Sequence, residues 1–129
     1  MISGKRKTAL AKVKVAVGNG KILYNSLPLT NLFYLHRLAL EEPLEIAKNV
    51  LGNLPVDMSV RTSGGGSEGQ IQAARLAIAK AIVAFTKSAE LKKAYLQYDR
   101  ALLVADTRRK EPYKPGDSKA RSKRQKSYR

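Results

Sequence analysis

The sequence of 129 residues contains no cysteine and no tryptophan, and it has a single histidine. The lack of cysteine excludes disulfide bonds and thiolate metal sites, and it is compatible with a reducing, cytoplasmic setting. Apolar runs are short, and none approaches the roughly 18 residues that a membrane-spanning helix needs. The first residues, "MISGKRKTALAKVKV", lack the apolar core of a signal peptide. We therefore expect neither a disulfide scaffold nor a membrane-spanning protein.

Acidic residues are scarce relative to basic ones. There are 10 Asp and Glu against 25 Lys and Arg, which gives a formal net charge of +15 at pH 7. A charge of that size opposes a compact state unless a polyanion neutralises it, so we expect a nucleic acid as partner. The histidine, His36, lies in the apolar stretch "NLFYLHRLAL". There we expect it to pack or to face RNA rather than to serve in a catalytic triad.

The positive charge is distributed unevenly along the chain. Residues 1–105 hold 15 basic and 7 acidic side chains, whereas residues 106–129 hold 10 basic and 3 acidic ones. The second segment has almost no apolar side chains, so it cannot bury enough surface to offset its ordering entropy. We expect an RNA-binding α/β body over 1–105 and an extended basic tail over 106–129 that becomes ordered only against a partner.

Periodicity within the body predicts alternating elements of both kinds. Alternation of apolar and polar residues predicts strands, and these lie at 7–17, 21–29 and 56–62. Apolar residues at helical spacing predict helices, and these lie at 31–39, 41–53, Ile71–Phe85 and 88–98. The run at 101–107 fits either a strand or a helix end. The order indicates a small two-layer α/β (α+β) domain.

Several details of these elements are also predicted. Val13, Val15 and Val17 point to one side of the first strand, which leaves Lys12 and Lys14 as a basic outer face. "GNG" at 18–20 supplies the residues of a tight hairpin, and Pro28 is expected to stop the next strand or place it at a sheet edge. The helix at 41–53 is expected to carry Pro43 in its first turn, and Ser88 is expected to cap the last helix.

The stretch "TSGGGSEGQIQAAR" contains the spacing G-x-G-x-x-G at Gly64, Gly66 and Gly69. A dinucleotide site would also need a ribose-binding acid at the end of the next strand, but Glu90 lies inside a helical pattern. A Walker A loop fails because Gln70 stands where lysine is required. Two interpretations stay open: a strand-to-helix turn that only needs glycine, or a turn whose N–H groups bind a nucleic-acid phosphate.

Four stretches of the chain carry longer motifs. They are "GKRKTALAKVKV" at 4–15, "GNGKILYNSLPL" at 18–29, "GGGSEGQIQAARLAIAKAI" at 64–82, and "DTRRKEPYKPGDSKARSKRQKSYR" at 106–129. Together they resemble, from end to end, the ninth protein family of the ribosomal small subunit, the universal S9 family. The closing Ser127-Tyr128-Arg129 replaces the bacterial Ser-Lys-Arg and resembles the archaeal and eukaryotic-type branch. We expect an archaeal source.

The resemblance implies a fold, a function and partners. The fold is a small ribosomal-protein-type domain with a left-handed βαβ crossover, an exception to the usual hand. The implied role is a structural constituent of the small subunit, without catalysis, catalytic residues, metal or cofactor. Its partners are the 3′ major domain of the small-subunit ribosomal RNA in the head and neighbouring head proteins. The tail is implied to extend to the peptidyl-site transfer RNA during translation, in the cytoplasmic ribosome.

Candidate binding residues follow from the basic strip, the glycine loop and the tail. For ribosomal RNA they are Lys5, Arg6, Lys7, Lys12, Lys14, Arg61, Gly64, Gly65, Gly66, Gln70, Arg75, Arg108, Arg109, Lys110, Lys119, Arg121, Lys123 and Arg124. For transfer RNA they are Lys126, Ser127, Tyr128 and Arg129. The basic strip comprises Lys5, Arg6, Lys7, Lys12 and Lys14, and it has a second interpretation as a solvated strand face. Arg75 has a second interpretation as a structural cap. A nucleotide-dependent enzyme and a single-strand-binding module fit less well, since the loop lacks the acid and the chain lacks aromatic rows.

Overall fold

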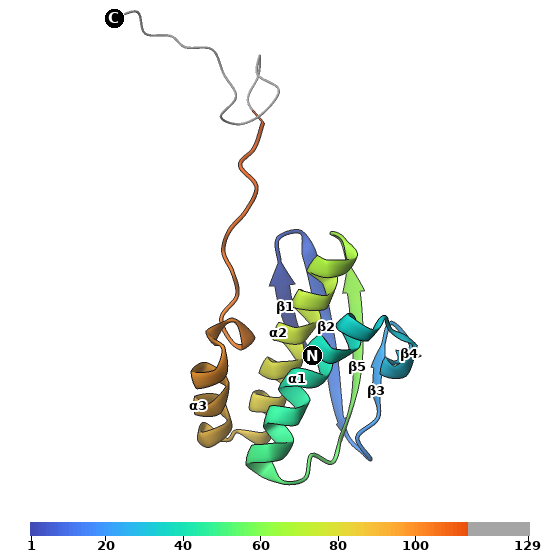
Figure 1. Ribbon diagram of the computed structural model, residues 1–129, viewed down its shortest axis with the longest axis vertical. Helices are drawn as coiled ribbons and strands as arrows, with labels where there is room; N and C mark the ends of the chain where they lie inside the picture. Colours follow the sequence, from blue (N-terminus) through green and yellow to red (C-terminus); the bar gives the residue numbers. More distant parts are fainter. Residues whose placement is uncertain (114–129) are drawn as a thin grey trace, which may run out of the picture.

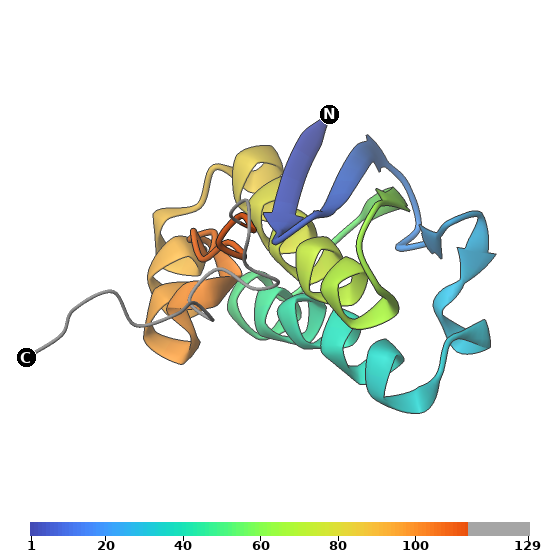
Figure 2. The ribbon, with the colours of Figure 1, turned by 90° about the horizontal axis from the view of Figure 1, so that it is seen from above.

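The computed structural model of the protein describes residues 1–113 and shows a sheet covered by helices on one face (Figures 1 and 2). Its elements are β1 (Ile2–Arg6), β2 (Ala9–Val17), β3 (Ile22–Tyr24), β4 (Leu27–Pro28), the 3₁₀ turn η1 (Leu29–Asn31), α1 (Tyr34–Leu51), β5 (Val56–Ser63), α2 (Ser67–Thr86), α3 (Ala89–Tyr98) and the 3₁₀ turn η2 (Arg100–Leu102). The strand order is β1-β2-β5-β3-β4. The predicted two-layer α/β class is confirmed. No helix within 1–113 is long and apolar enough to cross a membrane.

The crossover between β3 and β5 sets the hand of the fold. These two strands are neighbours and parallel, with Ile22 opposite Met58 and Tyr24 opposite Val60. The chain passes from β3 to β5 through α1, which lies in the helix layer. Figure 1 views the molecule from the helix side, with β5 pointing upward and lying to the left of β3. A crossover that moves to the left in this view is left-handed, as the resemblance implied.

The N-terminal strands differ from the sequence-based expectation. The strand expected at 7–17 is present as β2, which begins at Ala9. A strand that was not expected, β1, precedes it and pairs with it antiparallel across a turn that holds Lys7 at φ 52°. The hairpin expected at 18–20 is wrong, because β5 lies between β2 and β3. β2 and β5 form a long antiparallel ladder from Leu10–Ser63 to Val17–Val56, whereas β3 has only three residues. The long ladder outweighs the local turn signal. Pro28 lies in the edge strand β4, as predicted.

The two helices expected at 31–39 and 41–53 are one continuous helix, α1, with Pro43 inside it. Proline removes a hydrogen bond within a helix, and for that reason Pro43 was expected in a first turn, where no such bond is needed. Here the Pro43 ring is buried in the core. Its carbonyl also accepts a 2.7 Å hydrogen bond from the Tyr95 hydroxyl of α3. Tertiary packing therefore compensates for the local cost, and burial raises the pKa of the Tyr95 hydroxyl.

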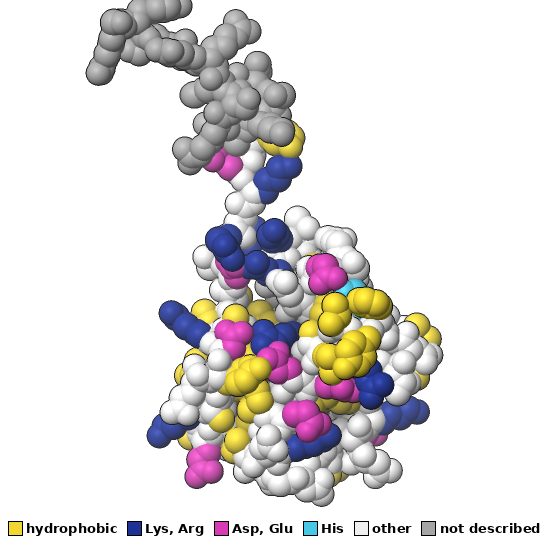
Figure 3. All heavy atoms as spheres, in the orientation of Figure 1, with side chains coloured by type: hydrophobic (Ala, Val, Ile, Leu, Met, Phe, Trp, Pro, Cys, Tyr) yellow, Lys and Arg dark blue, Asp and Glu magenta, His cyan; other side chains and the backbone are white. Residues whose placement is uncertain are grey.

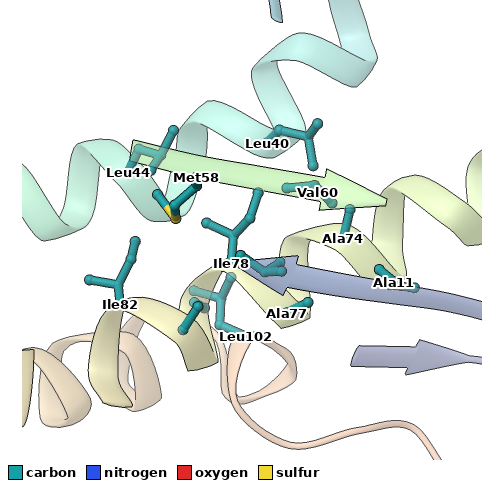
Figure 4. Packing of buried hydrophobic residues seen from close by; sticks show 14 of the residues in the cluster. Ala11, Leu40, Leu44, Met58, Val60, Ala74, Ala77, Ile78, Ile82 and Leu102 are labelled. Atoms are coloured by element: carbon teal, nitrogen blue, oxygen red, sulfur yellow. The ribbon is translucent and has the colours of Figure 1, made fainter. Parts of the chain in front are cut away.

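The core lies between the inner face of the sheet and α2 (Figure 4). The expected strand at 56–62 is confirmed as β5, with Val56, Met58 and Val60 buried. Small residues let the layers approach closely, because a Cβ on Gly4 of β1 would collide with the Ala73 carbonyl oxygen of α2. Phe85, expected on the buried face of α2, is 43% exposed in the last turn of the helix.

The C-terminal elements close the helix layer. Ser88 caps α3 as predicted, since its hydroxyl accepts a 3.3 Å hydrogen bond from the Leu91 N–H. The segment at 101–107, expected as a strand or a helix end, begins in the short turn η2, whose Leu102 is fully buried. The chain then leaves the body and extends away from it (Figure 1).

Candidate nucleic-acid interface

The outer face of the sheet carries a cluster of cations that no helix of residues 1–113 covers. Ladder partners lie on the same face of a sheet, so the register places Lys12 of β2 directly opposite Arg61 of β5. Lys14 lies two residues further along β2, opposite Ser59, and Lys5 lies on the edge strand β1. All four cationic side chains are exposed. We call Lys5, Lys12, Lys14 and Arg61 the basic sheet face.

The electrostatics of this face are unusual for a surface that meets only water. Two like charges directly opposite each other on a ladder lower stability, and Lys12 and Arg61 form such a pair. None of the four cations has an ion pair within the described part of the chain. The acid on this side of β5, Asp57, accepts a hydrogen bond from the Lys21 N–H at 2.8 Å. The face is therefore suited to a polyanion that neutralises it.

The glycine loop lies against the β1–β2 turn. Gly64 and Gly65 adopt φ angles of 71° and 64°, a region that favours glycine. A Cβ on Gly65 would also lie 3.0 Å from the Ala9 Cβ. Gly66 follows at φ −99° as the N-cap of α2, where the structure through residue 113 shows no side-chain cap. The loop thus needs glycine for its turn and also leaves helix N–H groups without a capping side chain.

Gln70, predicted to bind RNA, also has a role within the loop. Its Nε2 donates a 3.0 Å hydrogen bond to the Gly64 carbonyl, and its Oε1 accepts one from the Thr62 hydroxyl at 3.3 Å. The side chain therefore braces the glycine turn against the end of β5. The neighbouring Glu68 contacts His36, with 2.5 Å between Oε1 and Nε2. His36 also packs edge-on against the ring of Phe33, consistent with the packing role expected for it.

Arg75, named as an RNA-binding candidate with a second interpretation as a structural cap, does not share a site with Arg61. Its guanidinium contacts the carboxylate of Glu42 at 2.5 Å and that of Asp99 at 3.2 Å. It lies in the helix layer, on the side of the sheet opposite to the basic sheet face. The Tyr98 hydroxyl donates to the same Glu42 carboxylate, which raises the pKa of that hydroxyl. Arg75 thus joins α1, α2 and the end of α3.

Arg6 is also committed to partners inside the protein. Its guanidinium pairs with Asp106, and its Nε donates a 2.9 Å hydrogen bond to the Gln72 side chain of α2. Arg108 approaches the same Asp106 carboxylate at 2.8 Å while remaining 79% exposed. Arg109 bonds the Asp106 carbonyl at 3.2 Å. In Figure 3 Lys and Arg side chains gather where the chain leaves the body.

Sequence reasoning missed the acids that organise these arginines. Asp106 and Glu42 were counted only as charges, although the spacing of Asp106 and Arg108 within "DTR" was visible in the sequence. Lys110 was named as an RNA contact, and its ammonium lies 4.4 Å from the centre of the Tyr113 ring. The other predicted residues, Lys119, Arg121, Lys123, Arg124, Lys126, Ser127, Tyr128 and Arg129, lie outside the described residues.

The sequence is similar to a known family along nearly its whole length. Residues 4–129 match the family described as ribosomal protein S9/S16. A relative from Methanococcus vannielii, named "Small ribosomal subunit protein uS9", is 46% identical over 129 residues, covering 98% of this chain and 95% of the relative. A protein of the same name from Methanococcus maripaludis is 47% identical with the same coverage. Both relatives are archaeal, which agrees with the branch that the closing residues indicated.

Proposed function

The chain belongs to the ribosomal protein S9/S16 family, and from that premise we propose how its surfaces bind RNA. It is a structural component of the small ribosomal subunit, of the archaeal type, and not an enzyme. It acts in translation, in the cytoplasmic ribosome. The proposal has two parts. The basic sheet face and the tail bind the small-subunit ribosomal RNA of the head, and the end of the tail reaches the peptidyl-site transfer RNA.

The observation that carries the RNA proposal is the basic sheet face. Structured RNA is bound mainly through its shape and its phosphates, because its major groove is too deep and narrow for side chains. A surface that binds phosphates needs cations that no internal acid neutralises. The four cations of the sheet face meet this requirement within residues 1–113, and the opposed pair Lys12 and Arg61 loses its mutual repulsion when a phosphate lies between them.

The glycine loop extends the proposed RNA surface around the end of the sheet. Gly64, Gly65 and Gly66 begin α2 beside the β1–β2 turn, where Lys7 is exposed. Uncapped N–H groups at a helix N-terminus favour an anion, and Lys7 adds charge at the same end. The proposed phosphate contact uses the backbone of the loop, with Gln70 holding its shape. Arg75 is absent from this surface, because its two carboxylate partners neutralise it.

The tail continues the RNA surface from the base at Arg108, Arg109 and Lys110. Residues 106–129 carry 10 basic and 3 acidic side chains, and six cations with no acid follow from Ser118 to the end. An extended segment of this length reaches roughly 80 Å at about 3.3 Å per residue. The family resemblance and this charge support the proposal that the last residues, Lys126–Arg129, contact transfer RNA in the peptidyl site.

Cosedimentation with small ribosomal subunits tests the RNA proposal. The full chain is expected to travel with subunits, and replacing Lys12, Lys14 and Arg61 by glutamine is expected to reduce the bound fraction. Equal incorporation of the triple variant and the unaltered protein would contradict a role for the basic sheet face.

The transfer-RNA contact is tested separately from assembly. Subunits assembled with a chain lacking residues 127–129 are expected to release peptidyl-site transfer RNA faster than subunits with the full chain. Assembly itself is expected to be unchanged, because the body and most of the tail remain. Equal release rates from the two kinds of subunit would contradict the proposed contact.

A further inference from the structure

The outer face of the sheet is hollowed next to the basic sheet face. The hollow has a volume of about 390 Å³ and lies where β2, β5 and β3 run side by side. The ladders place Ser59 of β5 between Lys14 of β2 and Leu23 of β3. Ser59 is smaller than either neighbour, which leaves space above it. We call the following lining side chains the sheet hollow: Lys14, Ala16, Lys21, Leu23, Asp57 and Ser59.

The lining of the sheet hollow combines apolar surface with positive charge. Ala16 and Leu23 supply apolar surface. Lys14 and Lys21 are exposed, and neither has an ion pair within residues 1–113. The aliphatic stem of a lysine can line a recess while its ammonium group stays in solvent. The sheet hollow is therefore a partly apolar recess beside two available cations.

Two polar groups in the sheet hollow are available for hydrogen bonding. Asp57 accepts a 2.8 Å hydrogen bond from the Lys21 N–H through Oδ1, and its Oδ2 has no hydrogen bond within residues 1–113. The Ser59 hydroxyl has none either in this part of the chain. A Cβ on Gly18 would lie 2.1 Å from the Asp57 Cγ, so the turn at Gly18 fits closely against the carboxylate. The carboxylate is thus held in place with acceptor capacity to spare.

Three kinds of occupant can be compared with this lining. A phosphate fits poorly, because Asp57 repels it and the apolar surface offers it no hydrogen bond. A cationic side chain of another protein fits poorly too, because Lys14 and Lys21 repel it. An unpaired nucleobase fits, because its faces pack on Leu23 and its N–H groups donate to Asp57 while its flanking phosphates reach the two lysines.

We propose that the sheet hollow holds one unpaired base of the small-subunit ribosomal RNA, and that this base carries an amino group. The inference rests on the proposed function, since it takes RNA to lie on the basic sheet face. Lys14 belongs to both surfaces, so the hollow is continuous with that face. Asp57 sets the preference, because the amino groups of adenine, cytosine and guanine donate to a carboxylate. Uracil has a carbonyl oxygen on each side of its single N–H, and Asp57 repels both.

Chemical footprinting of a head-domain fragment of small-subunit ribosomal RNA tests this assignment. Dimethyl sulfate and kethoxal modify the pairing edges of unpaired adenine, cytosine and guanine, a carbodiimide modifies unpaired uracil, and hydroxyl radicals cleave accessible backbone. The full chain is expected to protect a stretch of backbone and to lower the reactivity of an amino-bearing base within it at least about tenfold. Protection of no unpaired base, or of uracil alone, would overturn the proposal.

Asp57→Asn is the variant that isolates the carboxylate. It keeps an oxygen for the Lys21 N–H but presents an amide NH₂, a donor, in place of Oδ2. Backbone protection is expected to remain, while the reactivity of the protected base rises about tenfold toward its value in free RNA. A base that stays fully protected by Asp57→Asn contradicts the proposal.

Filling the sheet hollow gives a second readout, which also serves if Asp57→Asn fails to fold. Ala16→Leu adds volume at the ladder partner of Asp57 without a change of charge, and it is expected to expose the same base. Ser3→Leu is the matched control, because Ser3 is an exposed ladder partner of Lys12 that lies outside the hollow. It is expected to leave the base protected. Equal reactivity of the base with both leucine variants would refute the assignment.

Backbone protection separates this inference from the proposed function. A chain that protects no backbone contradicts the RNA-binding face itself, and the inference with it. Backbone protection that is lost when Lys12, Lys14 and Arg61 are replaced by glutamine supports the face. With that result, a base that responds neither to Asp57→Asn nor to Ala16→Leu overturns the sheet hollow alone.

Discussion

The carboxylate of Asp106 pairs with the guanidinium of Arg6, so the chain leaves the body beside the edge strand β1. The two side chains are 26% and 21% exposed, which limits the solvent that screens them. Arg108 also donates hydrogen bonds to the same carboxylate, from Nε at 3.0 Å and from a terminal nitrogen at 2.8 Å. This relationship fixes where the proposed RNA-binding tail begins relative to the basic sheet face.

Replacing Asp106 by asparagine is expected to release the start of the tail. An ion pair at a partly exposed site contributes about 1 kcal/mol, which corresponds to a factor of about five in the detached population. Trypsin should therefore cleave after Arg108 and Arg109 about fivefold faster in Asp106→Asn, as measured by mass spectrometry of timed digests. Glu45→Gln, which removes the same charge from α1, is the matched control. Equal cleavage rates in Asp106→Asn and the unaltered protein would contradict the anchoring role.

The glycine loop permits a comparison between two adjacent glycines. Gly65→Ser places a side chain at φ 64° and within 3.0 Å of Ala9, so we expect a loss of about 1–3 kcal/mol in the free energy of unfolding. Gly66→Ser has φ −99° and open space, and serine is a better N-cap than glycine. We expect it to be neutral or slightly stabilising. Urea unfolding measures the free energy of unfolding of both variants. Equal losses would show that the positive φ of the turn is not why residue 65 is glycine.

Substitutions of Arg75 and Arg61 are expected to have different effects: the first on stability and the second on RNA affinity. Arg75→Gln leaves Glu42 and Asp99 without their partner, so the free energy of unfolding should fall by about 1–3 kcal/mol while RNA affinity stays unchanged. Arg61→Gln removes a like charge opposite Lys12, so stability should hold or rise slightly while RNA affinity falls. Urea unfolding and filter binding to ribosomal RNA measure the two effects. If Arg75→Gln is as stable as the unaltered protein but binds ribosomal RNA more weakly, Arg75 is part of the RNA-binding surface and the prediction is wrong.

The sequence predicted the elements whose pattern depends only on local burial. β5 alternates strictly, and α2 has an apolar face of many residues, so both were found. The β1–β2 hairpin and the position of β5 between β2 and β3 were not found, because strand order depends on pairings far apart in the sequence. The uninterrupted α1 was missed because Pro43 signals a break locally, and its compensating partner, Tyr95, lies 52 residues away.

The residues of the candidate site also fall into two groups: those that the sequence identified and those whose role only the structure shows. Lys12, Lys14 and Arg61 were identified by alternation, since the faces of a strand follow from its period. Arg6 and Arg75 looked equivalent to them as cations, yet their carboxylate partners come from distant segments: Asp106 for Arg6 and Glu42 for Arg75. Charge counting predicts that a chain binds a polyanion, but only the fold shows which cations remain available for it.

The most direct test of the RNA-binding account is the salt dependence of binding to a head-domain fragment of small-subunit ribosomal RNA. The full chain is compared with the variant Lys12→Gln, Lys14→Gln, Arg61→Gln and with a charge-matched control, Lys92→Gln, Lys93→Gln, Arg100→Gln. Each lost phosphate contact lowers the slope of log K against log salt by about 0.7–0.9. The account predicts a slope smaller by about 2–3 for the sheet-face variant and an unchanged slope for the control. Equal slopes for the sheet-face variant and the unaltered chain would contradict it.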